Sequence, residues 1–267
     1  MSILIIGGGN MGKTYAQSFL NSKLVKREDL FIYDKDKLKI DLINQFQIGT
    51  GVSILGDFVK QMDTIVLAVK PQDTKKLYPE LKHLVNKDQL FLSIMAGIRI
   101  HDIQEALGVD KVVRAMPNLP AQIGMGMTVF SASDKVPKPS LTYIQNLLET
   151  TGHSIIVDKE EMLDAATAIS GSGPAYVFYF LDALIQSAIE MGFSPSESYL
   201  LAEQTFLGSV NLFRRNNLTC HQWIEKVASR GGTTEAALEV FKENNVNNGI
   251  KEGIHKALIR AKELSFE

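Results

Sequence analysis

A glycine motif stands between the first apolar run of the chain and its first helical run. Residues 3–6 are four β-forming aliphatic residues, and Gly7-x-Gly9-x-x-Gly12 follows them, directly before helical character at 13–20. The first glycine permits a tight turn, the second lets a phosphate approach the backbone, and the third lets helix and strand pack closely. Free N–H groups at the helix start favour the phosphate charge. A lone motif is often only a tight turn, but this context predicts a dinucleotide-binding β–α unit.

An acidic residue follows the second predicted strand at the distance typical of such domains. Leu30–Tyr33 is a β-type run, and Asp34 stands 22 residues after Gly12. An acid at this place accepts hydrogen bonds from ribose hydroxyls and repels a 2′-phosphate, which favours NADH. Lys35 and Lys37 could still attract that phosphate, so the choice between NADH and NADPH is open. Asp34 could also simply cap the next helix.

Apolar strands and helical segments continue to alternate through the first part of the chain. We expect strands at 63–69, 90–94, 111–115, 127–131 and 154–157, and a helix at 141–150. The first of these runs is strongly apolar, as expected in a parallel sheet covered on both faces. Ligands in such sheets lie at the carboxyl ends of strands, which places Val69, Lys70 and Pro71 well for a nicotinamide. A plain strand-to-helix turn explains these three residues equally well.

Composition limits the classes of partner and site. The chain has 267 residues and a formal net charge of −2, which gives no general attraction to nucleic acid or to an acidic membrane. A single cysteine, Cys220, excludes an intramolecular disulfide and fits a reducing compartment. The five histidines lack the spacing of metal ligands, so we expect no metal site. We also see no apolar run of membrane-spanning length, and we expect a cytoplasmic protein with no membrane partner.

The second part of the chain is predicted to be helical throughout. Small residues at 170–173 predict a turn, and Pro174 then suits the first turn of a helix that is apolar on most faces through Met191. Capping-box patterns begin further helices after Ser194 and after Thr219. The helix from Pro174 is too apolar for solvent, so we expect it to form a subunit interface.

These patterns divide the chain in two. We predict an α/β Rossmann-like dinucleotide-binding domain at 1–159 and an all-α substrate-binding and dimerisation domain at 160–267. A chain of this length is long enough to form two domains.

Five blocks of the sequence resemble, in the same order, those of the pyrroline-5-carboxylate reductase family, the last enzymes of proline synthesis. They are Gly-Gly-Gly-Asn-Met-Gly at 7–12, Ala-Val-Lys-Pro at 68–71, Met-Ala-Gly at 95–97, Arg-Ala-Met-Pro-Asn-Leu-Pro at 114–120 and Ser-Gly-Ser-Gly-Pro-Ala-Tyr at 170–176. One block would be weak, whereas the ordered set is highly specific and extends over essentially the whole chain.

The resemblance implies NADPH or NADH as the cofactor. It implies that the pyrophosphate is bound by the loop residues Gly7, Gly9, Asn10, Met11 and Gly12, and that the cofactor lies along Val69, Lys70, Pro71 and Ala96. From the residues themselves, Asp34 and Lys35 are the candidates at its ribose.

A second glycine-rich segment, Ser-Arg-Gly-Gly-Thr-Thr at 229–234, precedes a helical run. Two glycines and two hydroxyls at a helix start form a potential site for a small carboxylate. Taken alone, the segment is better explained by a helix N-cap at Thr233 or Thr234.

The resemblance changes that balance, because the family carries Ser-Pro-Gly-Gly-x-Thr at this place. It implies that the substrate carboxylate is held by Ser229, Gly232 and Thr233, and that Thr234 hydrogen-bonds the ring nitrogen. Arg230 stands where the family usually has proline. That departure could loosen the loop, since arginine does not fix φ, or add a cation near the carboxylate.

The implied reaction is hydride transfer from reduced nicotinamide to the carbon of the cyclic C=N bond of pyrroline-5-carboxylate. A protonated imine is already an electrophile, so the protein mainly positions two ligands, and Thr234 is the residue expected to assist catalysis. Glu160 matches an acidic family position near the substrate, although a helix-start acid serving the dipole is an equally good interpretation. The alternatives are a reductase of another small imine or carbonyl and a cofactor-binding regulatory paralogue. The resemblance also implies a homodimer, often assembled further into a decamer.

Overall fold

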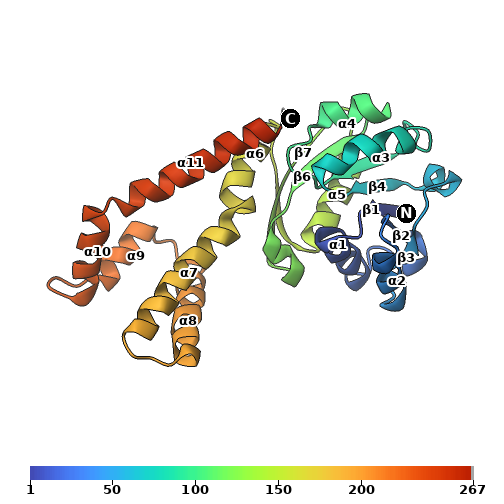
Figure 1. The fold of residues 1–267 in the computed structure, drawn as a ribbon. Helices are drawn as coiled ribbons and strands as arrows, with labels where there is room; N and C mark the ends of the chain where they lie inside the picture. The colour runs from blue at the N-terminus through green and yellow to red at the C-terminus, as the bar shows by residue number, and fades with distance from the viewer. Residues whose placement is uncertain (266–267) are drawn as a thin grey trace. The chain divides into compact units, whose positions relative to one another are not determined.

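The computed structural model describes residues 1–265 and forms two compact units (Figure 1). The first unit contains residues 1–172 together with the C-terminal segment from Ala257. The second unit is a continuous insertion, Gly173–Lys256, and its secondary structure is entirely helical. This α/β unit and this all-α unit confirm the predicted fold class.

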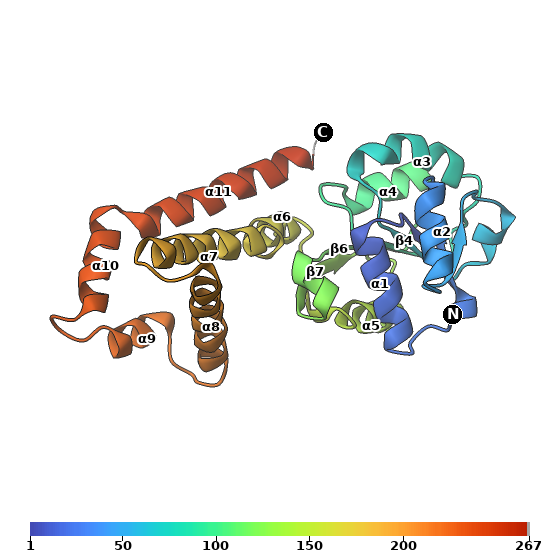
Figure 2. The ribbon, with the colours of Figure 1, turned by 60° about the horizontal axis from the view of Figure 1, so that its bottom comes forward.

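The first unit is built on one sheet of eight strands in the order β3-β2-β1-β4-β5-β6-β7-β8. Figure 2 shows this unit with strands β4, β6 and β7 labelled. The strands are β1 (Ile3–Ile6), β2 (Leu30–Tyr33), β3 (Thr50–Val52), β4 (Thr64–Leu67), β5 (Leu90–Ser93), β6 (Val112–Met116), β7 (Gly126–Ala132) and β8 (Gly152–Ile156). Neighbouring strands are parallel, except that β6 and β7 are antiparallel. All the predicted strands are present. The sequence does not predict β3, because this three-residue edge strand contains no apolar run.

Helices cover both faces of this sheet. They are α1 (Asn10–Asn21), α2 (Lys37–Gln45), α3 (Thr74–Leu81), α4 (Ile100–Leu107), α5 (Lys138–Glu149) and α6 (Met162–Ala166). Alternate residues of β1 enter different apolar clusters: Ile3 and Ile5 pack with residues of α1 and α5, whereas Leu4 and Ile6 pack with residues of α3 and α4. All four residues of β1 are fully buried, as expected for a central strand of a doubly covered sheet.

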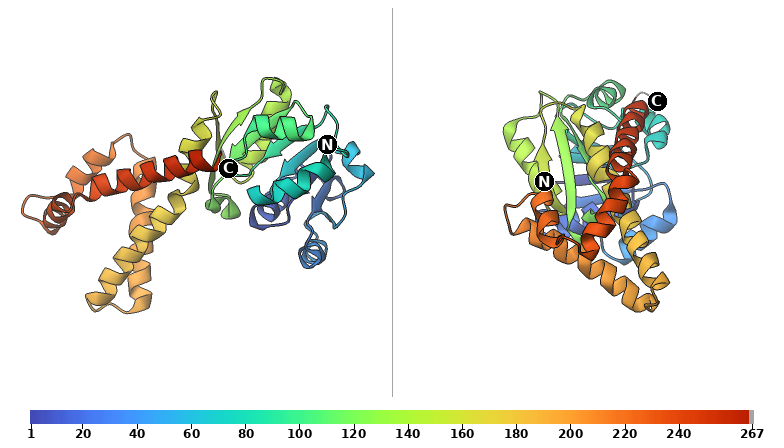
Figure 3. Two further views of the ribbon diagram at one scale, coloured as in Figure 1. Left: turned by 45° about the horizontal axis from the view of Figure 1, so that its top comes forward. Right: turned by 90° about the vertical axis from the view of Figure 1, so that its left-hand side faces the viewer.

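The second unit consists of α7 (Gly173–Glu190), α8 (Pro195–Arg214), α9 (Cys220–Val227), α10 (Thr233–Glu243) and the first part of α11 (Val246–Leu264). Helices α7 and α8 pack side by side (Figure 3). Both predicted capping boxes are present: Ser194 pairs with Glu197 at the start of α8, and Thr219 pairs with Gln222 at the start of α9.

The junction between α6 and α7 differs from the predicted turn. Residues Thr167–Gly171 form a π-helical turn that joins the two helices without a loop. Pro174 has no N–H to donate to the Ser170 carbonyl one turn earlier, and Asn118 supplies the missing donor, with its Nδ2 3.1 Å from that oxygen. The Asn118 Oδ1 also accepts from the Met127 N–H at 2.9 Å. A side chain from the loop after β6 therefore keeps this helical run continuous.

The first unit also extends past the predicted boundary at residue 159. The side chain of Arg114 in β6 is 5% exposed, and its guanidinium lies 2.9 Å from Glu160 Oε1 and 3.6 Å from Asp164 Oδ1. The Ser265 hydroxyl donates to the same Asp164 oxygen at 3.1 Å. One buried cation thus anchors α6 and the segment after α11 to the sheet, which is why both belong to the first unit.

The helical run Met162–Glu190 contradicts the expectation that the chain has no apolar run of membrane-spanning length. It has the length and composition of a membrane span, with a mean hydropathy of 1.2, and only 11% of its most apolar window is buried in the single chain. The small residues at 170–173, which predict a turn, divide this run in the sequence and hide its full length. Length and composition alone are weak evidence for a membrane span, and the same exposure is expected of a helix that a second chain covers.

We expect Arg114→Met to lower the free energy of unfolding by about 3–5 kcal/mol, because the substitution leaves the carboxylates of Glu160 and Asp164 without their buried cation. Urea unfolding followed by circular dichroism measures the change. Arg27→Met, at an exposed arginine, is the matched control and should stay within about 0.5 kcal/mol of the wild type. Equal midpoints for the two variants would show that the cluster does not anchor the unit.

Candidate functional site

The carboxyl ends of the central strands lie side by side at one edge of the sheet. Ile6 of β1 is in register with Tyr33 of β2 on one side and with Leu67 of β4 on the other. The strand order reverses here, because the chain runs from β1 outward to β2 and β3 and then returns to β4. In open α/β sheets the ligand-binding crevice lies outside the carboxyl ends at this reversal.

The three glycines of the motif meet different surroundings at this edge. Gly7 has φ +117°, and a Cβ there would lie 2.5 Å from the Ala68 carbonyl oxygen. A Cβ on Gly12 would lie 1.9 Å from the Gly7 carbonyl oxygen, so only glycine lets α1 pack this closely on the turn. A Cβ on Gly9 would meet no atom within 4 Å. Gly9 therefore borders open space, as expected where a phosphate approaches the backbone.

Helix α1 presents its N-terminus at the same edge. Gly9 is the N-cap, its position holds no capping side chain, and the first turn contains no acidic residue. Asn10 is exposed, whereas Met11 packs against the core beneath the helix. The first N–H groups of this 12-residue helix, together with its dipole, fit a pyrophosphate.

Asp34 follows β2 and is held rigidly beside the glycine loop. Its residue surface is 8% exposed, and its Oδ2 accepts from the Gly8 N–H at 2.8 Å and from Lys39 Nζ at 3.1 Å. Its Oδ1 accepts from the Asp36 N–H at 2.9 Å. The side chain of Asp36, rather than that of Asp34, caps α2. The alternative interpretation of Asp34 as a helix cap is therefore wrong.

The remaining predicted cofactor residues also lie at this edge. Val69 packs against the core just after β4, Lys70 is exposed, and Pro71 begins a short 3₁₀ turn. Ala96 is half-buried in the loop after β5. Lys35 reaches across from the end of β2 to the turn after β4.

Lys35 forms an ion pair with Asp73 of that 3₁₀ turn, with 2.8 Å between Nζ and Oδ1. This hydrogen bond raises the pKa of Lys35 and lowers the pKa of Asp73, so both groups are charged at neutral pH. The loops after β2 and β4 are thereby linked on either side of the glycine loop.

The predicted substrate loop lies in the helical unit, at the start of α10. Gly232 is the N-cap of α10, so the predicted N-caps Thr233 and Thr234 are wrong. The Gly232 N–H donates to the Ser229 carbonyl at 3.0 Å, which closes the loop as a tight turn. The Gly231 N–H donates to the carboxylate of Glu235, which folds back from the first turn of the helix. The N-cap Gly232 has no capping side chain, which suits the N-terminus of α10 to a small anion.

Two family models match the chain. "Pyrroline-5-carboxylate reductase dimerisation" matches residues 160–264, and "NADP oxidoreductase coenzyme F420-dependent" matches residues 2–97. A curated pyrroline-5-carboxylate reductase from Aquifex aeolicus is 33% identical over 99% of this chain and 97% of its own length. The chain belongs to the pyrroline-5-carboxylate reductase family.

Solved structures of this family match along the whole chain. The pyrroline-5-carboxylate reductase from Coxiella burnetii has a TM-score of 0.89 and 30% identity, covering 99% of this chain and 98% of its own. The Plasmodium falciparum pyrroline carboxylate reductase, solved with NADP bound, has the same TM-score and coverage at 28% identity.

One acidic residue that the family resemblance assigns to the substrate also has partners within the sheet unit. Glu160 Oε1 accepts from Arg114 at 2.9 Å and from the Ile100 N–H, also at 2.9 Å. This carboxylate therefore joins β6 to the start of α4. Glu160 was also interpreted as an acid that stabilises the dipole of the helix it precedes, α6. The N–H that it accepts from is instead that of Ile100, at the start of α4.

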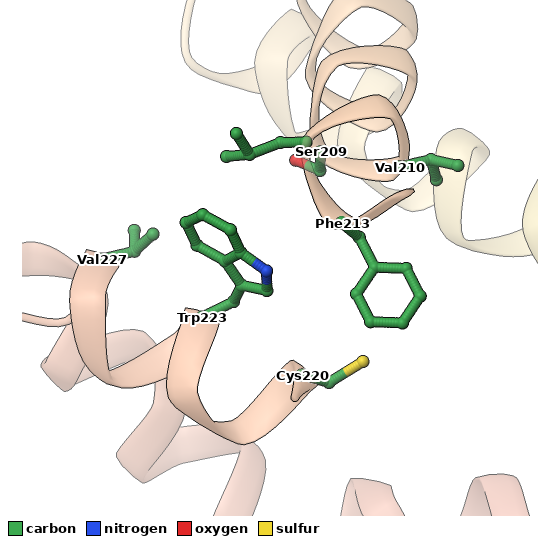
Figure 4. Close-up of a pocket in the computed structure, with 7 residues that line it drawn as sticks. Ser209, Val210, Phe213, Cys220, Trp223 and Val227 are labelled. Carbon is green, nitrogen blue, oxygen red and sulfur yellow. The ribbon is translucent and has the colours of Figure 1, made fainter. Parts of the chain in front are cut away.

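The helical unit of this family member also carries an apolar pocket. Residues of α8 and α9 line it: Ser209, Val210, Leu212, Phe213, Cys220, Trp223 and Val227 (Figure 4). The Trp223 Nε1 is buried without a hydrogen-bond partner in the part of the chain described. None of the predicted site residues lines this pocket, so we do not assign it to the reaction.

We expect Gly9→Ala to fold normally and to bind NADH about tenfold more weakly, because its Cβ enters only the path of the phosphate. Gly12→Ala is the matched comparison, and we expect it to lose at least about 3 kcal/mol of stability, because its Cβ overlaps the Gly7 carbonyl. Thermal unfolding and coenzyme fluorescence titration measure the two effects. Unchanged NADH affinity in Gly9→Ala would contradict the placement of the phosphate.

Proposed function

We propose that this chain reduces 1-pyrroline-5-carboxylate to L-proline with NADH or NADPH, the final step of proline biosynthesis. The observation that carries the proposal is the glycine loop at the β1/β4 reversal, where Gly9 borders open space at the start of α1. Membership of the pyrroline-5-carboxylate reductase family supplies the reaction.

Reduced nicotinamide supplies the hydride in this reaction. A new C–H bond forms at the imine carbon, and the π electrons of the C=N bond move to the nitrogen, which already carries a proton in the iminium form. The protein then has to bind the coenzyme and the substrate, orient them toward each other and polarise the C=N bond. This requirement agrees with a predicted site that contains no histidine or cysteine.

The loop at the start of α10 is proposed to bind the substrate. Ser229, Gly232 and Thr233 would hold its carboxylate, with the N-terminus of α10 favouring the negative charge. Thr234, in the first turn of α10, would hydrogen-bond the ring nitrogen. Glu160 stays a candidate for this set: Arg114 and the Ile100 N–H bind its Oε1, and its side chain is 24% exposed. Arg230 is exposed beside the loop and adds a cation that the family pattern lacks.

The proposal is tested by following the oxidation of NADH and NADPH by the purified protein with pyrroline-5-carboxylate. We expect Thr234→Ala to lower kcat about 10- to 100-fold with coenzyme affinity nearly unchanged, because only the hydrogen bond to nitrogen is lost. Thr234→Ser should recover most of the rate, since it retains the hydroxyl.

Thr205→Ala on α8 is the control, because the Thr205 hydroxyl donates within its own helix, to the Leu201 carbonyl. Equal losses of turnover and of coenzyme binding in Thr234→Ala would show that Thr234 is misplaced. Absence of turnover in the wild type, with coenzyme still bound, would favour a different small imine or a regulatory paralogue.

We also propose that the helical unit forms a homodimer. Many large apolar side chains of α7 and α8 are exposed in the single chain, including Phe178 at 58%, Tyr179 at 76%, Tyr199 at 61% and Leu200 at 65%. A soluble monomer rarely exposes so much contiguous apolar surface. The matched dimerisation model covers the same helices, and a second chain would bury both this surface and the pocket at Trp223. A decamer built from five such dimers, in the cytoplasm, is the further assembly that we propose.

Light scattering after size exclusion should give at least twice the 29.5 kDa chain mass at micromolar concentration. Leu200→Asp should halve the mass of the dimer, because it places a charge in the proposed interface. Leu38→Asp changes a leucine that is 75% exposed on the sheet unit and should leave the mass unchanged. A monomeric wild type would contradict the proposal, and a mass near ten chains would support the decamer.

A further inference from the structure

Charged side chains surround the edge where the adenosine ribose of a dinucleotide would lie. The segment after β2 carries two acids and three lysines, Asp34, Lys35, Asp36, Lys37 and Lys39. Asp73, in the turn after β4, forms a hydrogen bond with Lys35. Three of these six groups are acidic and three are basic. The six charges sum to zero, so the local charge near the ribose depends on which of these groups are paired with one another.

The Asp34 carboxylate is the fixed charge of the set. Its two oxygens accept hydrogen bonds from the N–H groups of Gly8 and Asp36 and from Lys39 Nζ. A carboxylate has room for about four such bonds, so one acceptor position is left for a ribose hydroxyl. The hydrogen bond to Gly8 ties the carboxylate to the glycine loop, so it cannot swing away from a 2′-phosphate.

Two lysines that could neutralise such a phosphate are already paired. Lys39 is bound to Asp34 itself, with 3.1 Å between the charged atoms. Lys35 points to Asp73 at 2.8 Å, and its raised pKa reflects that hydrogen bond first. Lys37 is exposed at the start of α2. For Lys35 to reach an NADPH phosphate it would have to leave Asp73, whereas binding of NADH requires no such rearrangement.

We propose that Asp73 is a positioning residue for coenzyme specificity: by holding Lys35, it withholds that cation from a 2′-phosphate beside Asp34, where Lys39 is already bound to the carboxylate, and makes this chain prefer NADH to NADPH. The inference rests on the proposed function only for the identity of the two coenzymes. It assigns a role to a residue in the turn after β4, which neither the glycine motif nor the acid after β2 indicates.

The test is equilibrium binding of NADH and of NADPH, measured by coenzyme fluorescence without substrate. We expect the wild type to bind NADH at least about fivefold more tightly than NADPH. Asp73→Asn should tighten NADPH binding about fivefold and change NADH binding less than twofold, because the freed Lys35 can then reach the phosphate. The gain in NADPH affinity should shrink at high salt, because the Lys35 side chain is exposed and its attraction to the phosphate is screened.

Two further variants separate this role from a structural one. Lys35→Met combined with Asp73→Asn should lose the gain for NADPH, because the lysine that delivers it is absent. Asp57→Asn breaks an exposed ion pair on another turn, Asp57 with Lys60 at 2.7 Å, and should leave both affinities unchanged.

The results distinguish this inference from the proposed function. A wild type that prefers NADPH, or an Asp73→Asn variant that changes both affinities equally, would overturn the inference even if pyrroline-5-carboxylate is reduced. The predicted affinities without turnover would support the inference and count against the proposed function. Binding of neither coenzyme would overturn both.

Discussion

The close packing of helix α1 on strand β1 is the constraint on which the candidate site depends. Gly12 lies so near the Gly7 carbonyl that any side chain would overlap it, and Gly7 itself lies against the end of β4 with a positive φ. This arrangement directs the N-terminus of α1 at the point where the strand order reverses. The free N–H groups, the helix dipole and the open space at Gly9 then coincide, and together they suit this loop to a phosphate without any cationic side chain in it.

Much of this arrangement could be predicted from the sequence because the signals are local. Runs of aliphatic residues predicted the strands, the glycine spacing predicted the β–α turn, and Ser-x-x-Glu and Thr-x-x-Gln predicted two helix starts. Each signal depends on residues only a few positions apart, where backbone geometry fixes which groups can meet. The edge strand β3 has no such apolar run and was missed.

The interactions that sequence reasoning missed join residues far apart in the chain. Lys35 and Asp73 are separated by 38 positions, Arg114 and Glu160 by 46, and Asn118 and Ser170 by 52. Nothing in their local patterns identifies the partner. The bond from Arg114 to Glu160 was consequently not predicted, and the assignment of Glu160 to the substrate stays a prediction. The small residues before Pro174 suggested a turn, because the donor that keeps the helical run continuous lies on a distant loop.

The central claim is that this chain transfers a hydride to the imine carbon of pyrroline-5-carboxylate. The most direct measurement uses NADH that carries deuterium at the transferable position of the nicotinamide, with the product analysed by mass spectrometry and NMR. We expect L-proline that is one mass unit heavier, with the deuterium on the ring carbon that was double-bonded to nitrogen. Proline without deuterium at that carbon, or no proline while NADH stays bound and unoxidised, would contradict it.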